Sequence, residues 1–175
     1  MGYIFSTLLI VMMLLQSGCG YTTGSVLPSN YKTIHVEPFE NKINFLNENS
    51  RTLYIPQLET NVRTAIISQF QQDGHLRIND SPSSDLVLKG KLIAYERDDL
   101  RTDNDQNVQE FRLRVVVALT MIDNTRAEEF FNESSFVGES TYLTSGSQAK
   151  SEAQALNDTL KDLARRVVER TIENW

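Results

Sequence analysis

Two long stretches in the middle of the chain alternate between apolar and polar residues, and they constrain the fold more than any other feature. Alternation with a period of two indicates β-strands with one covered face. The first run covers residues 85–97 and the second covers residues 108–123, joined by a charged connection at 98–107 that we expect to be flexible. Together they predict a long antiparallel hairpin. The residues expected on its covered face are Leu86, Leu88, Gly90, Leu92 and Ala94, then Phe111, Leu113, Val115, Val117, Leu119 and Met121.

Helical periodicity appears on both sides of this hairpin. Apolar residues recur at i, i+4, i+7 and i+8 over residues 55–72, where Gly74 supplies a left-handed cap, and again over residues 148–174. A β-rich segment at 31–39 precedes the first helix, and residues 128–139 favour one more strand. The pattern predicts an α+β fold in which two amphipathic helices pack on one face of a four- to five-stranded, mostly antiparallel sheet.

Composition argues against most enzyme classes and against nucleic-acid binding. The chain has 175 residues with a net charge of −6, whereas nucleic-acid binders usually carry a basic excess. A single cysteine excludes an internal disulfide and Cys-based metal or iron–sulfur sites, and only two histidines are present. No motif for a nucleophile, a nucleotide or a metal occurs, and the acidic run at 98–105 lacks EF-hand spacing. We therefore expect no catalytic residue, no metal and no separate cofactor.

The amino terminus has the features of an export signal. Residues 4–15 are uncharged and strongly apolar, too short for a membrane span but suited to a signal peptide, and small residues follow up to Cys19. The segment from Leu15 to Gly20 resembles a bacterial lipobox, although Gln16 stands where an aliphatic residue is usual. These features predict a lipoprotein signal peptide at 1–18, diacylglycerol and an N-acyl chain on Cys19, and a lipidated tether at 19–30.

Lipidation of Cys19 would hold the folded part, residues 31–175, at a membrane without a spanning helix. Gly20 favours the periplasmic face of the outer membrane, because the inner-membrane retention signal places Asp at this position. Two alternatives remain open: an ordinary signal peptide with a buried free cysteine, and myristoylation of Gly2.

Five basic residues of this acidic chain are expected to lie together on the outward face of the hairpin, with Tyr95 among them. One interpretation is a solvated face balanced by neighbouring acidic residues such as Glu96, Glu110 or Asp98. The other is a site for phosphate or carboxylate groups, such as the lipid A phosphates of lipopolysaccharide. The candidate residues are Lys89, Lys91, Arg97, Arg112 and Arg114.

The order of short motifs resembles one protein family. The motifs are Gly18-Cys19-Gly20-Tyr21, the strand Lys32 to Phe39, Leu58-Glu59 with Val62-Arg63, Asp85 to Gly90, and Ala164 to Glu169. In this order they resemble the lipopolysaccharide-assembly lipoprotein family, LptE. The resemblance implies two helices on one face of a mostly antiparallel sheet, and a non-catalytic subunit that binds lipopolysaccharide, plugs the LptD β-barrel and aids its assembly.

Two functions therefore stay in view. The first is an outer-membrane lipoprotein that works with an LptD-type barrel to place lipopolysaccharide in the outer leaflet. The alternative is a lipoprotein that activates or scaffolds another envelope machine, such as a peptidoglycan synthase, since similar folds serve different functions.

Overall fold

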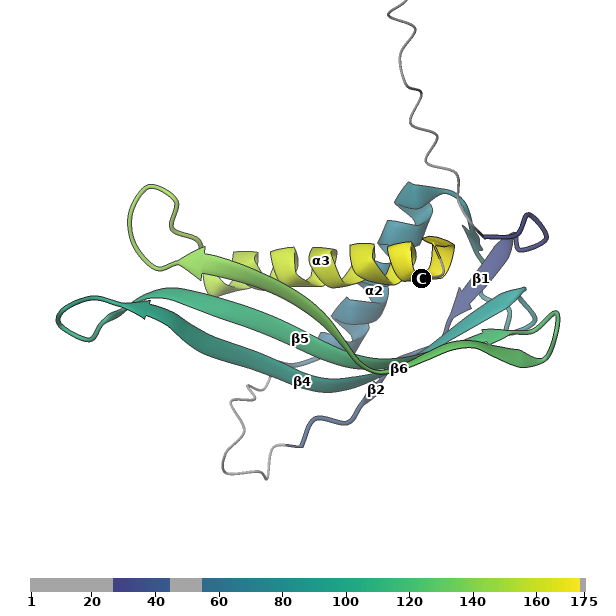
Figure 1. Cartoon of the computed structure of the whole chain (residues 1–175), viewed down its shortest axis with the longest axis horizontal. Helices are drawn as coiled ribbons and strands as arrows, with labels where there is room; N and C mark the ends of the chain where they lie inside the picture. Colours follow the sequence, from purple (N-terminus) through teal and green to yellow (C-terminus); the bar gives the residue numbers. More distant parts are fainter. Residues whose placement is uncertain (1–26, 45–54, 174–175) are drawn as a thin grey trace, which may run out of the picture.

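The computed structural model describes residues 27–44 and 55–173, which form one sheet and two helices (Figure 1). All elements with at least sixteen residues lie in the second part of the chain. The elements in chain order are β1 (Thr33–Val36), β2 (Glu40–Asn41), α2 (Leu58–Asp73), β3 (Arg77–Ile78), β4 (Leu86–Thr102), β5 (Val108–Asp123), β6 (Glu128–Leu143) and α3 (Glu152–Glu173).

The sheet has six strands in the order β3-β1-β4-β5-β6, and β2 pairs separately with β4. The three long strands form an antiparallel meander, β4 with β5 and β5 with β6. The short strands instead pair in parallel, β1 with both β3 and β4, and β2 with β4. The predicted α+β class is confirmed. The sheet has one more strand than expected, and its short strands pair in parallel beside the antiparallel meander.

Both helices lie on the same side of the sheet, as the apolar stripes predict (Figure 1). In this view α3 runs along the sheet, whereas α2 crosses behind it at a steep angle. The stripe of α2, from Leu58 to Phe70, is fully buried, and Gly74 ends the helix in a left-handed conformation with its N–H bonded to the Phe70 carbonyl. The core therefore lies between one sheet face and the two helices.

Close approach of α3 to β6 depends on Gly138. A Cβ atom at this position would lie 2.4 Å from Cβ of Leu163 and 2.7 Å from its Cα. The absence of a side chain lets the helix backbone rest directly on the strand at the middle of α3.

Half of the segment predicted as a flexible charged connection at 98–107 is strand, so the prediction is wrong for residues 98–102. β4 continues to Thr102 and pairs with β5 as far as Val108, leaving only residues 103–107 as the turn. Asp103 organises this turn by accepting backbone N–H bonds from Asp105 and Asn107 at 2.9 Å each. Cross-strand pairing thus extends the hairpin into a region whose composition alone suggests a loop.

Candidate anion-binding site

A bulge in β4 decides on which face of the sheet each basic side chain lies. The register with β5 shifts between Leu92 and Ala94, so Ile93 is an extra residue and the alternation inverts beyond it. Lys89 and Lys91, before the bulge, stand opposite Thr120 and Ala118. Beyond it, the same face is occupied by Glu96 and Asp98 from β4, opposite Arg114 and Arg112 from β5.

Arg97 does not share this face, which corrects the sequence prediction. It pairs with Leu113, which is buried on the helix side, and its Nη1 lies 2.7 Å from Oε2 of Glu152 at the start of α3. Tyr95 likewise lies on the helix side and not on the outward face: it is fully buried and its hydroxyl donates to Oε1 of Glu152 at 2.9 Å. The physical reason is the single extra residue at Ile93.

The groups around Glu152 form a compact cluster that joins the hairpin to α3. The Arg97 guanidinium lies 4.9 Å from the centroid of the Phe111 ring, which stacks on Tyr142 at 5.5 Å. The hydrogen bond that Arg97 donates to Glu152 raises the pKa of Arg97, and burial together with the same carboxylate raises the pKa of Tyr95. Arg97 is therefore engaged within the fold on the helix side of the sheet.

Arg112 and Arg114 stay on the outward face, but two carboxylates accompany them. Nη2 of Arg114 lies 2.8 Å from Glu96 and 3.0 Å from Asp98, and Nη2 of Arg112 lies 3.7 Å from Asp98. Asp98 is only 5% exposed. Two positive and two negative side chains thus balance one another here, so a ligand anion would have to compete with a carboxylate that is already in place.

The two lysines at the other end of this face are more accessible. Both are exposed; Lys89 lies 3.5 Å from Glu37, whereas Lys91 forms no ion pair within 4 Å in the part of the chain that the structure describes. Ile93, one of the few exposed large apolar side chains, follows directly. Among the predicted residues, Lys89 and Lys91 are therefore those best able to meet an external anion.

A second group of cations lies at the hairpin end and was missed from the sequence. A hollow of about 740 Å³ brings together Arg101, near the end of β4, and Lys150, just before α3. Hydroxyl and amide side chains share its lining, together with one carboxylate; these are Thr141, Ser147, Gln148 and Glu110. Arg101 has no ion pair within the described ranges 27–44 and 55–173. Arg101 was missed because residues 98–107 were expected to form a flexible connection, and only the extension of β4 places Arg101 beside residue 150.

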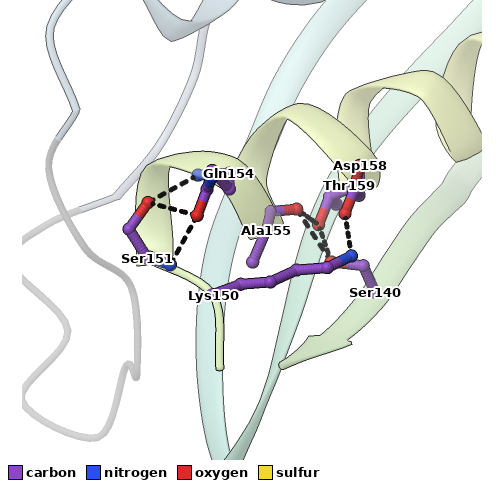
Figure 2. A network of polar contacts seen from close by, with 7 residues as sticks. All are labelled: Ser140, Lys150, Ser151, Gln154, Ala155, Asp158 and Thr159. Atoms are coloured by element: carbon purple, nitrogen blue, oxygen red, sulfur yellow. Dashed lines mark hydrogen bonds and ion pairs between the residues drawn. The ribbon is translucent and has the colours of Figure 1, made fainter. Parts of the chain in front are cut away.

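Lys150 is held directly before α3 by bonds to the end of β6 and to Asp158 of the helix (Figure 2). Its backbone N–H donates to the Leu143 carbonyl at 3.1 Å, and Ser151 and Gln154 cap the helix reciprocally. The side chain lies along α3 and its Nζ is 2.6 Å from Oδ2 of Asp158 (Figure 2). Because both groups of this pair are partly exposed, the interaction is weak enough for a multiply charged phosphate to compete.

The signal peptide, Cys19 and most of the tether lie outside the described residues. Within the described ranges, no group of histidine, cysteine or acidic side chains is arranged to hold a metal ion. Neither described helix has the combination of length and apolarity that a membrane crossing requires.

Comparison with known proteins assigns the chain to a family. A model of the lipopolysaccharide-assembly family LptE matches residues 31–171. The chain belongs to the LptE family. This match confirms the resemblance seen in the sequence motifs, and at the level of the family the protein is a lipoprotein of lipopolysaccharide assembly. The LptE family is a non-enzymatic component of lipopolysaccharide transport.

Solved structures share the fold at low sequence identity. Protein XCC0632 from Xanthomonas campestris is 11% identical with a TM-score of 0.58, covering 85% of this chain and 88% of its own. Protein CT253 from Chlamydia trachomatis is 13% identical with a TM-score of 0.51, covering 80% and 95%. PelC from Paraburkholderia phytofirmans, a dodecamer, is 14% identical with a TM-score of 0.50, covering 86% and 94%. No curated protein matches the chain. These likenesses show the fold alone.

Proposed function

We propose that this LptE-family protein is an outer-membrane lipoprotein that acts with an LptD-type β-barrel to deliver lipopolysaccharide to the outer leaflet. The family match over residues 31–171 carries the proposal. In this role Cys19 bears the diacylglycerol and N-acyl chain, and residues 19–30 tether the folded part at the periplasmic face. The protein needs no catalytic group, since its task is to bind lipopolysaccharide, to plug the barrel and to aid its assembly.

The shape of the hairpin supports a protein that reaches away from its anchor. The tether joins the described fold next to β1, whose Ile34 pairs with Leu86 at the beginning of β4. The turn at residues 103–107 lies at the opposite end of that strand (Figure 1). At about 3.3 Å per residue, the sixteen steps from Leu86 to Thr102 separate the two ends by roughly 53 Å. The hairpin would thus project deepest into the barrel.

Anionic groups of lipopolysaccharide have two places to bind on this fold. One is the outward face with Lys89 and Lys91, on which Arg112 and Arg114 are already paired with carboxylates. The other is the hollow with Arg101 and Lys150, where a planar guanidinium and an ammonium group face hydroxyl and amide side chains. Arginine and lysine together suit phosphate, which takes paired bonds from the first and a point charge from the second.

Purification of the tagged, full-length protein from its native envelope in mild detergent tests the partner. Mass spectrometry should find a large β-barrel in stoichiometric amount, with lipopolysaccharide retained. Recovery of a cell-wall synthase without a barrel would contradict the proposal and favour an activator instead. Mass analysis of the mature amino terminus should also show the acyl chains on Cys19, and a free thiol there would exclude the anchor.

Charge reversal separates the two anion sites. Lys89→Glu with Lys91→Glu, and Arg101→Glu alone, should each weaken lipopolysaccharide binding at low salt while circular dichroism stays unchanged. Arg77→Glu is a matched control, because Arg77 is exposed on β3, which β1 separates from β4, and it does not line the hollow at the hairpin end. Equal binding by all variants would refute both site assignments without affecting the family.

A further inference from the structure

A groove lined mostly by polar residues, with Leu160 and two alanines among them, runs between the two helices. It has a volume of about 740 Å³, within the range of pockets that hold small ligands. From α2 it is lined by one stripe at helical spacing that includes Asn61, Ser68 and Gln72, and from α3 by Asn157 and Lys161. α2 crosses α3 at a steep angle (Figure 1).

The chemistry of this groove differs from that of an ordinary solvated helix face. Every α2 residue in its lining is uncharged, and most carry an amide or a hydroxyl group. The side chains of Asn61, Gln69 and Asn157 make no hydrogen bond within the described part of the chain. Each amide offers both a donor and an acceptor, which is the pairing that vicinal sugar hydroxyls accept. Small apolar residues, Ala65 and Ala164, form its base.

The groove is continuous with the proposed anion site. A smaller hollow of about 270 Å³ shares Asn157 and Lys161 with it and shares Lys150 with the hollow at the hairpin end. Gln154, Asn157 and Lys161 follow one stripe of α3, so this path is one polar surface along the helix. The eleven steps from Lys150 to Lys161 span about 16 Å at helical rise.

Cations mark this path at intervals in a chain of net charge −6. Arg101 and Lys161 have no ion pair in the described ranges, and Lys150 has only the partly exposed bond to Asp158. Arg165, which also lines the groove, is bound to Asp162 and Glu169 and so contributes shape more than free charge. Separated cations among amides and hydroxyls suit a ligand in which anionic groups alternate with neutral polar ones.

We propose that the groove between α2 and α3 binds a phosphorylated oligosaccharide, namely the sugar portion of the lipopolysaccharide whose lipid-proximal phosphates sit at Arg101 and Lys150. This proposal rests on the proposed function and adds a sugar-binding site to it. The glycan lies along α3, with Lys161 facing a charged substituent and the amides of Asn61 and Asn157 bonded to hydroxyl groups.

The test uses the full-length protein in detergent and two probes. The first is the deacylated, phosphorylated core oligosaccharide released from Gram-negative lipopolysaccharide, and the second is lipid A without core sugars. Asn157→Ala with Lys161→Gln should weaken oligosaccharide binding at least tenfold in calorimetry and leave lipid A binding within twofold. Asn61→Trp fills the groove from the other helix and should have the same effect. Gln71→Ala with Lys42→Gln is the matched control, since both side chains are exposed and lie outside the groove lining.

The outcomes distinguish the groove from the underlying function. Wild-type protein that binds neither lipopolysaccharide nor lipid A would refute the proposed function itself. Wild-type protein that binds lipid A but not the oligosaccharide would refute only the groove. Oligosaccharide affinity within twofold of wild type in both groove variants would also refute it. Loss of a polypeptide from the native complex, with glycan binding intact, would identify the groove as a protein contact instead.

Discussion

Replacement of Gly138 by alanine tests the packing that positions α3. The new Cβ would lie 2.4 Å, 2.7 Å and 2.8 Å from Cβ, Cα and N of Leu163, whereas ordinary contacts begin at 3.4 Å. The helix must therefore move away from β6 by about 1 Å. Overpacking of this kind costs about 1–3 kcal/mol, and we expect the upper end because backbone atoms cannot rotate aside.

Thermal and chemical unfolding of the full-length protein measure this cost. A loss of about 3 kcal/mol corresponds to a decrease in Tm of roughly 6–12 °C for a domain of this size. Gly90→Ala is the matched comparison: the three atoms nearest to its Cβ would all be ring atoms of Phe39, at 2.2–2.4 Å, and a side chain can shift. We expect that variant to lose about 1 kcal/mol.

A double variant separates backbone from side-chain contact. If the clash lies with Cα and N of Leu163, then adding Leu163→Ala to Gly138→Ala removes buried apolar volume without relieving it, and stability falls further. Recovery of stability in the double variant, or a Tm within 1 °C of wild type for Gly138→Ala, would refute this account of how α3 rests on β6.

Three further changes probe the electrostatics of the fold by denaturant unfolding. Asp98→Ala removes the 5%-exposed carboxylate beside Arg114 and should cost about 1–2 kcal/mol, discounted because the arginine is partly exposed; no loss would show that the pair is inert. Glu152→Gln should cost a similar amount by weakening the bonds that join the hairpin to α3, whereas Glu169→Gln on the exposed side of α3 should change stability by less than about 0.5 kcal/mol. Backbone N–H bonds, first from Lys32, hold the pKa of Asp85 below its ordinary 3.8, so stability present above pH 3.8 should be lost as the pH falls further, and Asp85→Asn should abolish that part of the acid dependence. A pH profile of Asp85→Asn identical to that of wild type would contradict this.

The long elements could be predicted from the sequence because their periodicity extends over many residues. Alternation in β5 holds without interruption from Phe111 to Met121, and the structure buries the predicted side of its central part. The helical stripes were equally clear, and Gly74 ends α2 as its left-handed conformation requires. Parallel pairing of β1 with β4 was not predictable, since strand direction depends on how the chain returns through α2 and leaves no local pattern.

The faces of β4 beyond residue 92 could not be assigned by counting alone. The only signal was a run of four apolar residues, 92–95, which breaks the alternation that precedes it. A bulge is one explanation of such a run, and it places Tyr95 and Arg97 on the helix side. The acidic composition likewise concealed the last strand residues of the hairpin, because exposed strands tolerate charge on both faces.

The division of the basic residues into paired and accessible groups follows from their side chains and surroundings. Arginines in the middle of the sheet stand opposite acids across the strands: Arg114 binds two carboxylates at once, and Arg112 lies near one of them. Lys91, Arg101 and Lys161, which form no ion pair among the described residues, lie instead at exposed positions on the outward face, the hairpin end and the helix groove. An anionic amphiphile would therefore meet accessible charge on several surfaces, whereas the paired arginines stabilise the sheet that holds those surfaces in place.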